Sequence, residues 1–117
     1  MKEIARKALL FDFYGELLTE HQKKVYEDAV MNDYSLSELA EEYGVSRQGI
    51  HDLLKRCDAI LEGYEEKLGL IKRFGELKEL AGGIRQDMDR LEECGSDKEK
   101  EELISSMKVR IEQLEML

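Results

Sequence analysis

A short stretch in the middle of the chain, residues 46–56, carries side chains suited to contact with a nucleic acid. Guanidinium and amide groups can bind the edge of a base through two hydrogen bonds, and ammonium groups bind phosphate. Arg47 and Gln48 are our candidates for reading bases, and Lys24, Lys55 and Arg56 are our candidates for holding phosphates. The full set of candidate DNA-binding residues is Ser46, Arg47, Gln48, His51, Asp52, Lys55, Arg56 and Lys24.

Two helices and a tight turn must position these side chains, and residues 35–57 have the pattern of a helix-turn-helix. Counted from Leu36, this motif requires five apolar residues, one small residue and one glycine at fixed places, so that two helices cross closely as one rigid unit. The residues at these places are Leu39, Tyr43, Val45, Ile50, Leu53, Ala40 and Gly44. We expect Gly44 to be left-handed and Val45 to point inward. An ordinary αα-hairpin has similar caps, but the complete set favours the DNA-binding motif.

The residues before this motif predict two more helices. Apolar side chains at three- and four-residue steps predict a first helix over residues 2–18, and its three aromatic residues are expected in the core. Thr19 and Gln22 form a capping-box pattern that begins a second helix, and residues 32–34 form the loop before Ser35. Ser35 and Ser46 are expected to cap the two helices of the motif.

The residues after the motif predict further helices that pair with another chain. Apolar residues continue at three- and four-residue steps as far as Leu91, and we expect this long helix to break near Phe74-Gly75 or Gly82-Gly83. Residues 84–117 should form an antiparallel hairpin, in which Ser96 and Glu99 provide a third capping box. The hairpin has more apolar surface than two helices can bury, so we expect a two-fold homodimer with reading helices about 34 Å apart.

Composition excludes several classes of protein. The chain has 117 residues, no proline, few β-branched residues and no long apolar run, which predicts an all-α protein without a membrane span, located in the cytoplasm. The chain has no Cys-x-x-Cys pair and only two histidines, His21 and His51, so its cysteines do not predict a zinc site, and no cofactor is expected. The net charge of −9 opposes a polyanion at long range. A local strip of Lys23, Lys24, Arg47, Lys55 and Arg56 could still bind DNA, weakly for a single module.

A family resemblance rests on Leu18-Thr19, Gln22, Val25-Tyr26, the run from Tyr34 to Gln48, and Lys55-Arg56, with Phe11–Tyr14 and Leu61–Leu68 on either side. These residues resemble region 4 of sigma factors and, more closely, the small bacterial YlxM family, the UPF0122 group of helix-turn-helix proteins. The resemblance extends to about residue 75. It implies an all-α regulatory protein, usually encoded beside the signal recognition particle GTPase. Gly49 departs from the alanine usual in that family.

The sequence therefore predicts a sigma region 4-like helix-turn-helix domain over residues 1–57 and a C-terminal helical dimerisation region over residues 58–117. The favoured function is DNA-binding regulation of transcription, within or alongside the signal recognition particle pathway. The alternative is an acidic adaptor that binds the signal recognition particle protein or its RNA without sequence-specific DNA binding. An enzyme is disfavoured because neighbouring carboxylates such as Glu41 and Glu42 diverge on a helix and His51 has no nucleophile nearby.

Overall fold

The computed structural model describes residues 3–117, and this part of the chain is helical throughout, with no strand, as predicted for an all-α protein. The α-helices in chain order are α1 (Glu3–Tyr14), α2 (Glu20–Val30), α3 (Leu36–Tyr43), α4 (Arg47–Leu68), α5 (Leu70–Glu93) and α6 (Asp97–Glu115); a short 3₁₀ turn, η1 (Gly15–Leu17), follows α1. The chain forms two compact units, one ending at Ile71 and the other beginning at Lys72.

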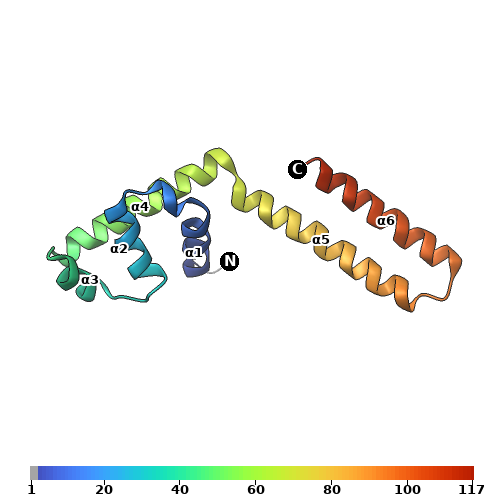
Figure 1. Ribbon diagram of the computed structural model, residues 1–117, viewed down its shortest axis with the longest axis horizontal. Helices are drawn as coiled ribbons and strands as arrows, with labels where there is room; N and C mark the ends of the chain where they lie inside the picture. The colour runs from blue at the N-terminus through green and yellow to red at the C-terminus, as the bar shows by residue number, and fades with distance from the viewer. Residues whose placement is uncertain (1–2) are drawn as a thin grey trace. The chain divides into compact units, whose positions relative to one another are not determined.

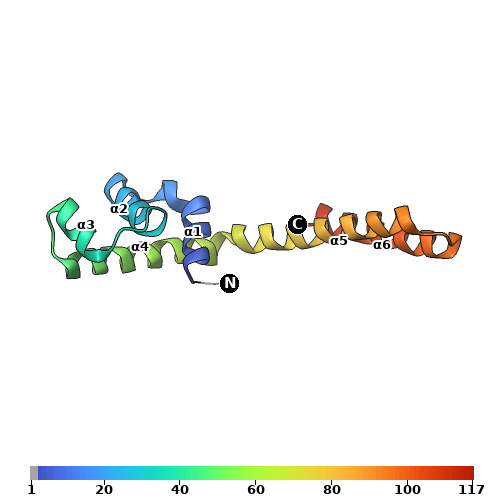
Figure 2. The same ribbon diagram turned by 90° about the horizontal axis from the view of Figure 1, so that it is seen from below.

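In the first unit, α1, α2 and α3 pack against α4 (Figure 1, Figure 2). One cluster of buried side chains joins α1 to α4 around Leu10, Tyr26 and Leu61, and a second joins α2, α3 and α4 through Val25, Leu39 and Ile50. Each fully buried apolar side chain of this size contributes about 1.5–3 kcal/mol. The helix-turn-helix is therefore fixed to a scaffold made by the preceding helices.

Local signals for helix starts are confirmed. Thr19 and Ser35 each form a complete capping box, and Gly44 ends α3 in the left-handed conformation with a φ of 65°. The prediction for Val45 is wrong, because its side chain is 47% exposed. Its backbone N–H donates to the Ala40 carbonyl, so its main chain closes the turn while its side chain remains at the surface.

The predicted break points of the C-terminal helix are also wrong. The helix that begins at Arg47 continues to Leu68, where Gly69 adopts a φ of 62° and ends it. The next helix, α5, then runs without interruption through Gly75 and the pair Gly82-Gly83. The two compact units of the structure separate near residue 71.

The second unit is a hairpin in which α5 and α6 run antiparallel (Figure 1). A partly buried ion pair joins the helices: the Arg110 guanidinium donates to Asp87 at 2.5 Å and to Ser106 Oγ at 2.7 Å. Gly83 makes room for it, since an added Cβ would lie 2.9 Å from Arg110 Cδ. Ser96 caps α6 by accepting the Glu99 N–H.

Candidate nucleic-acid interface

The predicted interface begins at the N-terminal end of α4. Ser46 accepts the Gly49 N–H at 3.0 Å and caps the helix, so its hydroxyl has a structural role. Gly49 is exposed, and an added Cβ would lie 3.1 Å from Ser46 Oγ, so a glycine here leaves room for the cap. Arg47 follows the cap directly and is exposed at the N-terminal end of the helix.

The next polar residues of α4 interact with one another. Gln48 Nε2 donates to Asp52 Oδ1 at 2.9 Å, one helical turn further on. His51 Nδ1 lies 3.7 Å from the same oxygen, beyond hydrogen-bonding distance, and is buried without a hydrogen-bond partner among residues 3–117. Asp52 therefore orients Gln48, while it also places a negative charge in the middle of the exposed face.

Three cations complete the set of predicted contacts. Lys24, Lys55 and Arg56 are exposed, and none of them forms an ion pair with another residue of the described range. Lys23, which the sequence suggested as part of the same basic strip, is instead paired with Glu16 at 2.5 Å. Residues 46–56 carry three cations against one carboxylate, so this segment is locally positive in an acidic chain.

Three hydrogen bonds between tyrosine and carboxylate, which sequence reasoning missed, connect the helices of the first unit. Tyr43 of α3 donates to Asp28 of α2, and Tyr26 of α2 donates to Asp58 of α4, each at 2.7 Å. Burial, followed by the hydrogen bond to Asp28, raises the pKa of Tyr43 to about 12. Burial and the bond to Asp58 likewise raise the pKa of Tyr26. Both hydroxyls are therefore protonated donors near neutral pH.

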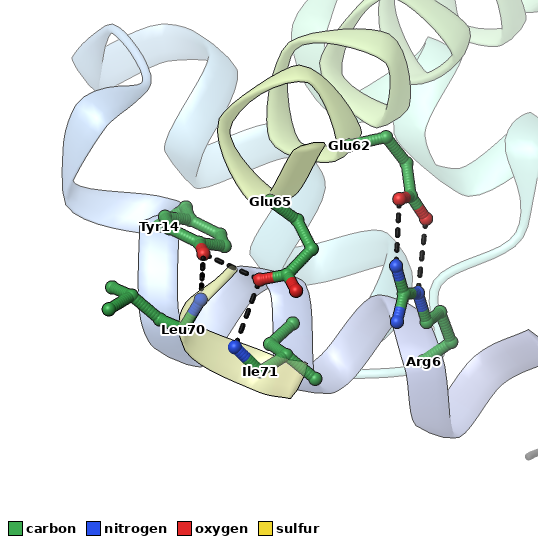
Figure 3. A network of polar contacts seen from close by, with 6 residues as sticks. All are labelled: Arg6, Tyr14, Glu62, Glu65, Leu70 and Ile71. Carbon is green, nitrogen blue, oxygen red and sulfur yellow. Dashed lines mark hydrogen bonds and ion pairs between the residues drawn. The ribbon is translucent and has the colours of Figure 1, made fainter. Parts of the chain in front are cut away.

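The third such bond lies at the joint between α4 and α5 (Figure 3). Tyr14, which is 1% exposed, donates to Glu65 Oε1 at 2.6 Å and accepts the Leu70 N–H at 3.1 Å. The same Glu65 oxygen accepts the Ile71 N–H at 2.9 Å. The N–H groups in the first turn of a helix have no partner within that helix. At the start of α5, the Tyr14 hydroxyl of α1 and the Glu65 carboxylate of α4 accept the N–H groups of Leu70 and Ile71.

Nearby, Arg6 of α1 makes a two-pronged ion pair with Glu62 of α4, with Nε and Nη2 at 3.1 and 2.9 Å from the carboxylate oxygens (Figure 3). This pair and the bonds of Tyr14 and Tyr26 attach α1 and α2 to α4. Within residues 3–117, no cluster of three His, Cys, Asp or Glu side chains could hold a metal ion.

Comparison with known proteins agrees with this architecture. Residues 1–108 match the UPF0122 family, described as "Putative helix-turn-helix protein, YlxM / p13 like". The chain belongs to this family. UPF0122 protein YlxM of Bacillus subtilis is 42% identical over 115 residues, which cover 98% of both chains. A UPF0122 protein of Thermoanaerobacter sp. (strain X514) is 42% identical over 108 residues, covering 92% of both chains.

A further relative is a UPF0122 protein of Caldanaerobacter subterraneus, which is 49% identical over 78 residues covering 67% of each chain. The resemblance inferred from the motif residues is therefore confirmed over most of this UPF0122 protein. None of the helices described, over residues 3–117, is both long and apolar enough to span a membrane.

Proposed function

We propose that this UPF0122 protein is a DNA-binding regulatory protein that inserts the N-terminal half of α4 into the major groove. The observation that carries the proposal is the helix-turn-helix itself, with a left-handed Gly44 between α3 and α4 and the exposed side chains of Arg47, Gln48, Lys55 and Arg56 directly behind the turn. A groove about 12 Å wide admits one α-helix, and the first turns of the second helix of such a motif face the bases.

Arg47 has the central part in this proposal. It is exposed, carries no ion pair within residues 3–117, and stands in the first turn of α4, where a guanidinium can bind two acceptors of a guanine. Gln48 is held by Asp52 and can exchange that bond for an adenine edge. Lys55, Arg56 and Lys24 supply contacts to phosphate, so they contribute affinity without sequence preference.

Rigidity of the reading helix supports the same proposal. α4 has 22 residues, is capped at both ends and is tied to α2 through the Tyr26–Asp58 bond. A side chain held on such a rigid element needs little further ordering when it binds. The helix therefore presents residues 46–56 in one arrangement.

A fluorescence-anisotropy titration with genomic DNA fragments at two salt concentrations tests the proposal. Arg47→Ala should weaken binding by about 10-fold, the loss expected when a contact of about 1–3 kcal/mol is removed. Arg90→Ala is the matched control, because Arg90 is an exposed arginine of α5 outside the reading helix. Equal binding by wild type, Arg47→Ala and Arg90→Ala would refute the role of α4.

A second candidate function is favoured by the net charge of −9, which suits a basic protein partner better than a nucleic acid. In this alternative the protein is an adaptor for the signal recognition particle protein or its RNA. A pull-down with the purified particle distinguishes the two candidates. Recovery of the particle by both the wild type and Arg47→Ala, without any DNA binding, would favour the adaptor.

A further inference from the structure

The second unit buries very little of its own apolar surface. Among residues 72–117 only Asp87 and Leu103 are buried, whereas the first unit has two clusters of buried apolar side chains. Helices in isolation are marginal in water, and most of their stability in proteins comes from packing an apolar face. The α5–α6 hairpin therefore needs additional cover.

One side of this hairpin has a groove between the two helices. Its polar lining comes from Glu76, Glu79 and Gln86 of α5 and from Arg110 and Gln113 of α6, and Leu80 and Leu117 also line it. Because these residues line one groove, they all lie on the same side of the hairpin. Their positions give the direction from which the other side chains of α5 and α6 can be located.

The opposite side of the hairpin is apolar. At 100° per residue, Leu77 and Met88 lie about 150° around α5 from the groove residues, and Ile104 and Ile111 lie about 140° around α6 from theirs. The exposed fractions of these four side chains are 45%, 54%, 42% and 45%. These four side chains thus lie on the side away from the groove, whereas the exposed Val109 of α6 does not.

The spacing of this surface is that of a helical bundle. We define the apolar face as Leu77, Ala81, Ile84, Met88, Ile104, Met107 and Ile111. Its members follow one another at three- and four-residue steps on each helix, as in the seam of packed helices. Ile84 and Met107 are half-buried, whereas Leu77, Met88, Ile104 and Ile111 are exposed.

We propose that the apolar face binds the same face of a second copy, so that two hairpins form a four-helix bundle. The face is two helices wide, and at about 1.5 Å per residue it runs about 17 Å along α5 and about 11 Å along α6, which gives about 280 Å² of flat area per copy. Side-chain relief increases this area, and two copies together approach the roughly 1,000 Å² of a specific interface. A two-fold axis through the centre of the face makes it complementary to itself.

Charges beside the apolar face support an antiparallel second copy. Lys78 flanks the face in the N-terminal half of α5, and Asp89 and Glu92 flank it in the C-terminal half. When two α5 helices pack antiparallel about the centre of the face, Lys78 of one helix lies beside Asp89 of the other. Pairs of opposite charge of this kind select the orientation of partner helices.

The molar mass of the full chain, measured by light scattering after size exclusion, tests the pairing. The wild type should have twice the 13.6 kDa of one chain. Ile111→Glu and Met88→Glu should reduce the mass to that of one chain, because each places a carboxylate in the bundle. Val109→Glu is the matched control: Val109 is 53% exposed but lies about 160° around α6 from Ile111, and this variant should remain a dimer.

Circular dichroism of each variant ensures that the change in mass reports pairing and not unfolding. A wild type with the mass of one chain at tens of micromolar would overturn the proposal, as would equal behaviour of Val109→Glu and Ile111→Glu. The pairing does not depend on nucleic-acid binding. A monomeric wild type that binds DNA through α4 would refute only the pairing. A dimeric wild type that does not bind DNA would refute only the proposed function.

Discussion

The hydroxyl of Tyr14 should be one of the largest single contributions to the stability of the first unit. Replacing Tyr14 by phenylalanine keeps the ring and removes two interactions, the 2.6 Å bond to Glu65 and the acceptor of the Leu70 N–H (Figure 3). A hydrogen bond to a charged group contributes about 1.5–3 kcal/mol, and a buried donor without a partner costs about 1–3 kcal/mol. Glu65 keeps its bond to the Ile71 N–H. We therefore expect Tyr14→Phe to lower the free energy of unfolding by about 2–4 kcal/mol.

Urea denaturation followed by circular dichroism measures this loss. Each molar of urea lowers the free energy of unfolding by about 2 kcal/mol. The urea concentration at the midpoint of unfolding should therefore fall by about 1–2 M. Tyr64→Phe is the matched control, because the Tyr64 ring stacks on Tyr14 at 6.0 Å but its hydroxyl has no hydrogen-bond partner within the described range. That control should change stability by less than about 0.5 kcal/mol. Equal midpoints for Tyr14→Phe and Tyr64→Phe would refute the role assigned to the joint.

Three further predictions concern other groups. Asp52→Asn should raise DNA affinity about threefold, because it removes a negative charge from the exposed face of α4; unchanged or weaker binding in an anisotropy titration would contradict this. Burial raises the pKa of the Cys57 thiol to about 11, so Cys94 should react first with a thiol reagent and Cys57 only on unfolding; equal rates in the native protein would be the contrary result. The pKa of Tyr43 is raised to about 12, so its contribution to stability is complete below about pH 10 and is lost between pH 10 and 12. Urea midpoints should fall over that window less steeply for Tyr43→Phe than for the wild type, and identical slopes would disprove the assignment.

Features set by neighbouring residues could be predicted from the sequence. The caps at Thr19, Ser35 and Ser46 depend on groups within three residues of one another, and the structure contains all three. The left-handed Gly44 follows from the same local geometry. The helix-turn-helix could be found for this reason, since its defining contacts lie within about 20 residues.

Features set by contacts between distant residues could not be predicted. Several glycines after residue 57 were equally able to end a helix, and the sequence favoured Gly75 or Gly82-Gly83. The break occurs at Gly69, where Tyr14, some 50 residues earlier in the chain, and Glu65 supply acceptors for the next helix. Gly83 lies instead beneath the guanidinium of Arg110, a packing role that no local pattern indicates.

The candidate site was predicted in part. Arg47, Lys55 and Arg56 are exposed on α4, as a reading helix requires. The bond between Gln48 and Asp52 was not foreseen, although the two residues are separated by one helical turn, a spacing at which side chains interact. Val45 is exposed because its place in the turn is fixed by its main chain.

The most direct test of the account is an NMR titration of the ¹⁵N-labelled full chain with a short genomic DNA duplex. Chemical-shift changes should concentrate on residues 46–56, with a smaller effect at Lys24, and they should disappear in Arg47→Ala at raised salt. Changes confined to the second unit, or an unchanged spectrum at saturating DNA, would contradict the claim that α4 is a nucleic-acid-reading helix.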